Sequence, residues 1–178
     1  IGIQAFQDEH LQKMNRRHNA QQAEKAIMNA VTAGFINLSV DLIYGLPNLT
    51  IEQWMASLNR VFQLPVQHLS AYHLTYHEGT PFYTWLKKGT LRELSEDDSV
   101  AQFNTLIDRA AAAGFEQYEI SNFARNEMYS RHNSAYWMGQ KYLGLGPSAH
   151  SYDRKKRRWN VAHVESYLQG LSAGNPYF

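Results

Sequence analysis

Three polar side chains in the first third of the chain could together bind a small charged molecule. Gln4 follows Gly2 in an apolar stretch, Arg16 lies in the loop beyond it, and Asp41 stands among aliphatic residues. A guanidinium binds a carboxylate through two parallel hydrogen bonds, so Arg16 suits an amino-acid group. A carboxylate in an aliphatic strand is costly unless it is paired, which at Asp41 suits a ligand hydroxyl or a cation. A solvated arginine and an aspartate bonded to a neighbouring strand remain the ordinary alternatives.

A second group of chemically capable residues lies in the last third. Residues 132–137, His-Asn-Ser-Ala-Tyr-Trp, combine an imidazole, an amide and two large aromatic rings. This composition suits a flat aromatic ligand or a metal-centred macrocycle, and it equally suits an ordinary packed corner. The same two interpretations apply to His150, which ends the glycine-rich segment 144–150. The spacing of those glycines is not a dinucleotide-binding fingerprint.

The basic run at residues 154–158, Arg-Lys-Lys-Arg-Arg, raises the possibility of nucleic-acid binding. The whole chain has 17 basic and 16 acidic residues and a net charge of +1. A nearly neutral chain has no general attraction for a polyanion, and a charged turn is usually solvated. We therefore expect no nucleic-acid partner.

The elements that would position these residues alternate between strands and helices. Extended apolar runs at residues 1–6, 36–43 and 68–74 are followed by helical patterns, which predicts parallel βαβ units in an α/β fold. The first helix is expected at residues 21–33, and two more should be capped by Thr50 with Gln53 and by Ser95 with Asp98. Beyond them we expect an extended segment at 118–123, a turn at 153–158 and a helix at 160–171.

Alternation in the second predicted strand separates two faces. Leu38, Val40 and Leu42 should pack against helices, whereas Asn37, Ser39 and Asp41 should line the interior near a ligand. Three parallel strands cannot close a barrel. The chain also begins in an apolar stretch without methionine and ends in Asn-Pro-Tyr-Phe. We therefore expect further sequence at both ends.

Two absences narrow the class of protein. The chain has no cysteine, which excludes disulfides and thiolate metal sites made by its own residues. It also lacks a run of about 18 apolar residues, the length needed for a transmembrane helix. We expect a soluble, cytoplasmic protein.

Four separated blocks resemble one known family. They are Gly-Ile-Gln-Ala-Phe at 2–6, Arg16, Val-Asp-Leu-Ile-Tyr-Gly-Leu-Pro at 40–47, and Leu-Ser-Ala-Tyr-His-Leu at 69–74. Together they resemble the radical S-adenosylmethionine (radical SAM) family that contains oxygen-independent coproporphyrinogen III oxidase and related haem chaperones. The resemblance implies an incomplete TIM-type (β/α)6 barrel, with its later strands in residues 1–117 and a carboxyl-terminal region in residues 118–178. It also implies S-adenosylmethionine contacts by Gln4, Arg16, Asp41, Ile43 and Thr75.

The downstream segments resemble one branch of this family, the HemW haem chaperones. Residues 132–137 are similar to its HNxxYW motif, and residues 118–124 and 143–150 are also similar to that branch. This resemblance implies that His132 contacts haem, which is then passed to haem-acceptor proteins. The alternative within the family is coproporphyrinogen III oxidation in porphyrin biosynthesis.

The family also holds a [4Fe-4S] cluster on the thiolates of a CxxxCxxC motif. This chain has none of those cysteines, so we expect them upstream. The residues present should then support no radical chemistry by themselves.

Overall fold

The chain folds into two compact units in the computed structural model, which describes residues 1–174. The first unit spans Ile1–Tyr129 and the second spans Ser130–Phe178. The terminal Asn-Pro-Tyr-Phe segment lies outside the described residues. The domain boundary that the resemblance implies between residues 117 and 118 stays a prediction.

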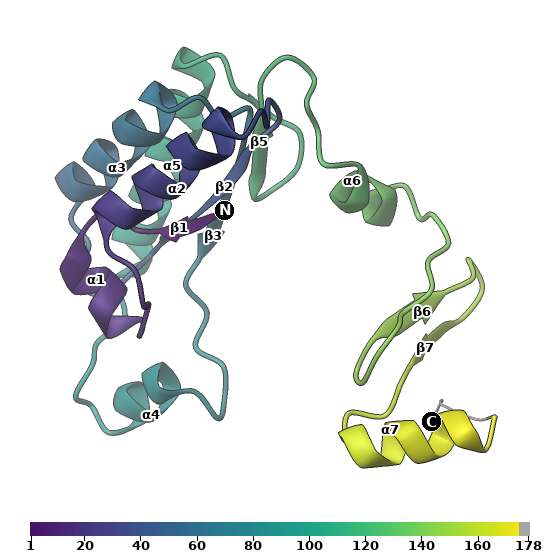
Figure 1. Cartoon of the computed structure of the whole chain (residues 1–178). Helices are drawn as coiled ribbons and strands as arrows, with labels where there is room; N and C mark the ends of the chain where they lie inside the picture. The colour runs from purple at the N-terminus through teal and green to yellow at the C-terminus, as the bar shows by residue number, and fades with distance from the viewer. Residues whose placement is uncertain (175–178) are drawn as a thin grey trace. The chain divides into compact units, whose positions relative to one another are not determined.

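The first unit is built on a five-stranded mixed sheet (Figure 1). Its strands are β1 (Gly2–Gln4), β2 (Ser39–Tyr44), β3 (His68–His73), β4 (Glu116–Gln117) and β5 (Asn122–Ala124), in the spatial order β1-β2-β3-β5-β4. The first three strands are parallel, and β5 pairs antiparallel with both β3 and β4. The predicted α/β class with parallel βαβ units is therefore confirmed, with an antiparallel pair added at one edge.

Five helices connect the strands of this unit: α1 (Asp8–Lys13), α2 (Ala20–Thr32), α3 (Ile51–Gln63), α4 (Pro81–Lys87) and α5 (Glu96–Ala112). The helices α2, α3 and α5 cover one face of the sheet, whereas α4 lies away from it in the segment after β3 (Figure 1). Thr50 and Gln53 form the predicted capping box, and Ser95 accepts a hydrogen bond from the Asp98 N–H at 3.0 Å. Both caps satisfy backbone N–H groups that a helix start leaves unpaired.

The core lies between the helices and the sheet. Val40 and Leu42 of β2 are fully buried, as their alternation predicts, and they belong to one cluster with Trp54 and Leu58 of α3 and Leu106 of α5. Each such side chain stabilises the fold by about 1.5–3 kcal/mol relative to an exposed position. The core therefore fixes which face of β2 points away from the helices.

Arg125 joins the end of β5 to the segment before β3. Its Nε donates to the Val66 carbonyl at 2.8 Å and its Nη2 donates to the Leu64 carbonyl at 3.3 Å. Its guanidinium also lies 4.5 Å from the ring centre of Phe115. Leu64 is the C-cap of α3, so the arginine supplies positive charge and donors at the negative end of that helix.

The second unit contains two short helices and a hairpin. They are α6 (Arg131–Trp137), β6 (His150–Tyr152), β7 (Arg157–Trp159) and α7 (Val164–Ser172). The strands β6 and β7 pair antiparallel, and Tyr142 forms a further bridge to Tyr152. Among the described residues of this unit only Asn160 is buried. The unit therefore has little apolar core of its own.

Several predicted extents were wrong. The first strand spans only Gly2–Gln4 instead of residues 1–6, and the predicted turn at 153–158 ends earlier because β7 begins at Arg157. The second strand begins at Ser39 rather than Ile36, because the Leu38 N–H donates to the Gln67 side chain instead of to a strand. The last helix begins at Val164 rather than Asn160, whose buried amide donates to the carbonyls of Gly144 and Gly146. Residues 118–121 form the turn between β4 and β5, and only residues 122–123 of the predicted extended segment lie in a strand, β5. No helix in the described part of the chain is long and apolar enough to cross a membrane.

Candidate functional site

A row of polar positions crosses four strands of the sheet. The strand register places Gly2 beside Asp41, Asp41 beside Ser70, and Ser70 beside Asn122. Ser70 donates to the Asn122 Oδ1 at 2.7 Å, and the Asn122 amide donates in turn to the Glu119 carboxylate. Asp41 alternates with buried Val40 and Leu42, so this row faces away from the helices. The polar residues of this row, Asp41, Ser70 and Asn122, are called the polar floor below. They lie on the face where the sequence predicts ligand binding.

Gln4 and Asp41 come together at one end of this row. The backbone of Gln4 has a φ of +71°, and the β1–β2 register shifts between Gly2 and Gln4. The Gln4 side chain therefore folds back over Gly2. A methyl group added to Gly2 would overlap the Gln4 amide nitrogen and lie 3.9 Å from Asp41 Oδ2. The missing side chain at Gly2 leaves room for the amide and carboxylate to face a common space.

Arg16 lies in an exposed loop after α1. Its N–H donates to the Leu11 carbonyl at 2.9 Å, and His18 Nε2 hydrogen bonds to the Ile3 carbonyl at 3.1 Å. These bonds hold the loop against β1, close to Gln4 in the chain. Within the described residues, no hydrogen bond or ion pair joins the Arg16 guanidinium to Gln4 or Asp41. A carboxylate ligand would therefore not have to displace such a bond.

The two remaining predicted contacts of this site differ in position. Ile43 lies on the Asp41 face near the end of β2, is partly buried, and is paired in register with Tyr72. Thr75 is exposed two residues beyond β3, and its hydroxyl lies 3.5 Å from the His73 carbonyl. Gln4, Asp41 and Ile43 thus share one sheet face, while Arg16 and Thr75 belong to loops. The role of all five as cofactor contacts stays a prediction.

His68 is a buried polar residue that the sequence analysis did not single out. Its Nδ1 lies 2.8 Å from the Ser39 hydroxyl and its Nε2 lies 2.7 Å from the Tyr118 hydroxyl. Burial lowers the pKa of His68, and the negative charges of Asp41 and Glu119 oppose this shift only in part. The imidazole therefore favours its neutral form. Strand alternation is the sequence signal that could have identified it. His68 is two residues before Ser70 and therefore lies on the same face of β3.

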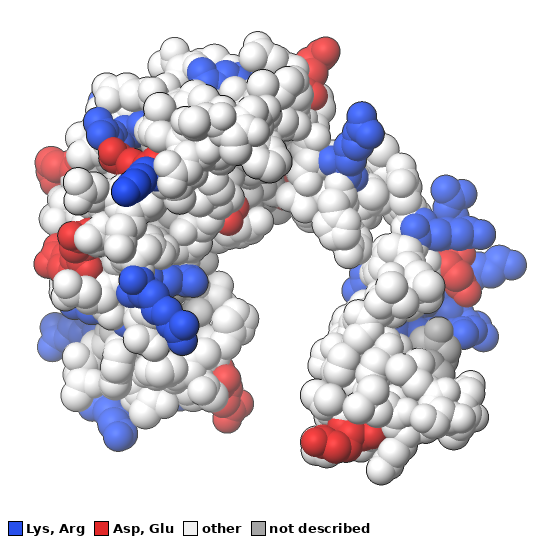
Figure 2. Space-filling model, in the orientation of Figure 1, with Lys and Arg blue, Asp and Glu red and all other residues white. Residues whose placement is uncertain are grey.

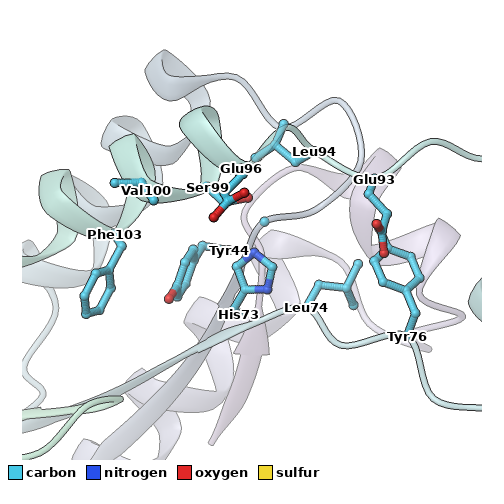
Figure 3. Close-up of a pocket in the computed structure, with 11 residues that line it drawn as sticks. Tyr44, His73, Leu74, Tyr76, Glu93, Leu94, Glu96, Ser99, Val100 and Phe103 are labelled. Atoms are coloured by element: carbon cyan, nitrogen blue, oxygen red, sulfur yellow. The ribbon is translucent and has the colours of Figure 1, made fainter.

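A separate pocket opens between the end of β3 and the beginning of α5 (Figure 3). Its volume is about 440 Å³, and its lining includes Tyr44, His73, Tyr76 and Glu93. Burial, followed by the charge of Glu93, raises the pKa of Tyr76 to about 12. The hydroxyl of Tyr76 is buried without a hydrogen-bond partner among the described atoms. None of the predicted site residues lines this pocket.

His132 belongs to α6 of the second unit, where it is exposed. Ser130 caps this helix by accepting from the Asn133 N–H at 3.3 Å. The ring centres of His132 and Tyr136 are 4.9 Å apart, and those of Tyr136 and Tyr142 are 4.8 Å apart, both in edge-on contact. The helical spacing of four residues thus places the imidazole at the end of an aromatic series.

The residues present do not form an iron–sulfur site. The sequence has no cysteine, and the described residues contain no group of three or more His, Cys, Asp or Glu side chains that could hold a metal ion. A [4Fe-4S] cluster needs thiolate ligands. The sheet face can therefore offer contacts for an organic cofactor but not for the cluster.

Comparison with known proteins gives this geometry a context. Residues 1–61 match the radical SAM superfamily. The chain is 35% identical over 178 residues to the heme chaperone HemW of Bacillus subtilis, covering 99% of this chain and 47% of that protein. It is 38% identical over 150 residues to the mouse protein named radical S-adenosyl methionine domain-containing protein 1, mitochondrial, covering 84% of this chain and 34% of that protein. The chain thus spans less than half the length of these relatives.

A solved structure shares the fold. The chain aligns with coproporphyrinogen III oxidase (HemN) of Escherichia coli, described as a radical SAM enzyme, with a TM-score of 0.78. The alignment covers 99% of this chain and 43% of the enzyme at 22% identity. At this identity the likeness concerns the arrangement of helices and strands.

Proposed function

We propose that the chain is part of a haem chaperone, because its residues 1–61 match the radical SAM superfamily and it is similar to HemW over nearly its whole length. Its first unit would form the later strands of an incomplete (β/α)6 barrel, and its second unit would bind haem. The arrangement of His132, Tyr136 and Tyr142 carries the proposal, because it combines an exposed imidazole with aromatic rings. An imidazole can ligate haem iron, and aromatic rings suit contact with a flat macrocycle.

The polar sheet face supports an S-adenosylmethionine site in the first unit. Asp41 could accept hydrogen bonds from ligand hydroxyls, Gln4 could both donate and accept, and Arg16 could bind a carboxylate. Ile43 would supply apolar contact, and Thr75 a hydroxyl at the rim. When bound beside a reduced cluster, this cofactor supplies radical chemistry, and we propose that the cluster thiolates belong to the part of the longer relatives that this chain does not span.

A second candidate function is coproporphyrinogen III oxidation, because the fold aligns with E. coli HemN. The two functions differ in what the protein does with its tetrapyrrole ligand. An oxidase must convert coproporphyrinogen III under anaerobic conditions, whereas a chaperone must bind haem and release it to an acceptor protein. Formation of protoporphyrinogen by cluster-reconstituted full-length protein would favour the oxidase and contradict our proposal.

Haem titration of matched histidine variants tests the chaperone proposal. We expect His132→Ala to weaken binding by about tenfold or more, since it removes the proposed iron ligand, and to alter the Soret band. His163→Ala is the control, because His163 is also exposed in the second unit but is the N-cap residue of a different helix, α7. Equal Soret spectra and affinities for both variants would refute the role of His132. Absence of haem binding by the unmodified protein would refute the proposed function itself.

The partner and the location complete the proposal. We propose that haem-acceptor proteins receive the ligand and that the protein acts in the cytoplasm. The mouse relative is named a mitochondrial protein, so the compartment can differ among relatives. Fractionation of cells that express the full-length protein tests the location directly.

A further inference from the structure

We infer that the haem held at His132 also lies against one face of the hairpin in the second unit. Its macrocycle contacts Tyr142, Tyr152 and Trp159, and one of its propionates binds Arg157. This inference rests on the proposed haem-binding function and adds residues outside the motif at 132–137. Five observations carry it: the ring contacts, the strand register, the position of one arginine, the exposure of the apolar side chains and the presence of a second imidazole.

The aromatic series does not end at α6. Tyr142, whose ring meets Tyr136, also lies 5.9 Å from the ring centre of Tyr152 in β6. The backbones of Tyr142 and Tyr152 are joined by hydrogen bonds in both directions, at 3.0 and 2.9 Å. The rings from α6, the following segment and β6 therefore form one continuous series that begins at His132.

The hairpin register adds two more rings to the same side. His150 pairs with Trp159 and Tyr152 pairs with Arg157, so these four side chains project from one face of β6 and β7. The ring centres of His150 and Trp159 are 6.0 Å apart with an interplanar angle of 33°. This face, formed by Tyr142, His150, Tyr152, Arg157 and Trp159, is called the hairpin face below.

Charge on the hairpin is divided between its two sides. Figure 2 shows lysine and arginine side chains gathered on this part of the second unit. Asp153 accepts hydrogen bonds from the Lys155 and Lys156 N–H groups at 2.8 and 2.7 Å, which closes the turn and leaves Arg157 and Arg158 in β7. Arg157 lies on the hairpin face beside Tyr152, whereas Arg158 pairs with Ser151 on the opposite side. Of the two arginines of β7, Arg157 is the one that the strand register places on the same face as the aromatic rings.

The apolar side chains of this unit are too exposed to be explained by packing among its described residues. Trp159 is 52% exposed and Tyr136 is 46% exposed, and the neighbouring Leu143 and Leu145 are 68% and 81% exposed. Burial of such surface is favourable at about 25 cal/mol per Å². A flat, largely apolar dianion matches a surface of aromatic rings with a guanidinium at its edge and imidazoles within it. Haem has these properties, since it carries two carboxylates on one side of an apolar ring.

The two neighbouring arginines of β7 provide a matched test. Haem affinity should fall about fivefold in Arg157→Gln, the size expected for an exposed charge-assisted contact, and should be unchanged in Arg158→Gln. With haem dimethyl ester, which lacks both carboxylates, Arg157→Gln should make no difference. Equal affinities of the two variants for haem would overturn the assignment of Arg157.

A second variant tests the aromatic contact independently of charge. Trp159→Ala should weaken binding of both haem and its dimethyl ester by about tenfold, because a large stacking surface is lost. Circular dichroism of each variant should match that of the unmodified protein, since Arg157 and Trp159 are both exposed. If His132→Ala weakens binding but Trp159→Ala does not, the hairpin face is covered by something else, and this inference fails while the proposed function stands. If the unmodified protein binds no haem, both fail.

Discussion

Replacing Gln102 by leucine should destabilise the first unit by about 3 kcal/mol, because two buried backbone groups would lose their only described side-chain partner. Gln102 lies in α5 and is 1% exposed. Its Oε1 accepts from the Gly45 N–H at 2.9 Å, and its Nε2 donates to the Leu49 carbonyl at 2.8 Å. The glutamine amide thus holds both ends of the turn that follows β2.

The magnitude follows from what leucine leaves behind. Each buried backbone donor or acceptor without a partner costs about 1–3 kcal/mol, and leucine would leave one of each, at Gly45 and Leu49. The indole of Trp54 should keep its bond, because it donates to the Gln102 backbone carbonyl at 2.9 Å. Urea unfolding followed by far-ultraviolet circular dichroism measures the change. A loss below about 1 kcal/mol would refute the reasoning.

A glutamate at the same position separates the two hydrogen bonds. Gln102→Glu keeps an acceptor for Gly45 but, when ionised, has no donor for Leu49. Burial should raise the pKa of such a carboxyl group, and its protonated form could donate again. A group whose pKa is raised on folding stabilises the fold at low pH and loses that contribution as pH rises. The stability gap to the unmodified protein should therefore narrow between pH 7.5 and pH 5, while a constant gap would contradict this explanation. Gln12→Leu, at an exposed helical position, is the control.

Three further outcomes are expected in the first unit. Because burial lowers the pKa of His68 below 6.5, the unfolded chain binds the extra proton first, so stability should fall below about pH 6.5 by up to about 1.4 kcal/mol per pH unit. His68→Gln should reduce this loss in urea unfolding at several pH values. Ultraviolet titration should find Tyr76 ionising near pH 12, and Glu93→Gln should lower that value, since Glu93 contributes to the shift. Gly45→Ala should cost at least about 1–2 kcal/mol in the same unfolding assay, because Gly45 has a φ of +71° and the added methyl group would overlap the His73 ring.

Local signals in the sequence predicted much of the first unit correctly. The caps at Thr50 and Ser95 were predictable because each depends on a partner three residues away. The face of β2 on which Asp41 lies, away from the helices, was predictable from strand alternation, which needs no knowledge of the neighbouring strands. Sequence reasoning is reliable where the determining contact is close in the chain.

Contacts between distant residues were not predictable in the same way. His68 meets Tyr118 across 50 residues, and the amide of Gln102 meets Gly45 across 57. The antiparallel direction of β5 depends on its pairing with β3, so the alternation of strand and helix patterns in the sequence did not predict it. The polar floor was therefore predictable at Asp41 but not at Ser70 and Asn122. These two residues join it only through the pairing of Asp41 with Ser70 and of Ser70 with Asn122.

The bonds from Arg125 to the end of α3 have a consequence for synthesis on the ribosome. Arg125 lies 61 residues after Leu64, whose carbonyl it binds, so α3 leaves the ribosome well before its capping cation exists. At about 5–20 residues per second, the interval is about 3–12 seconds. During that time the carbonyl groups of Leu64 and Val66 lack the side-chain donors of Arg125, and β5 is also missing from the edge of β3. The nascent first unit therefore reaches its complete hydrogen bonding late, when translation passes residue 125.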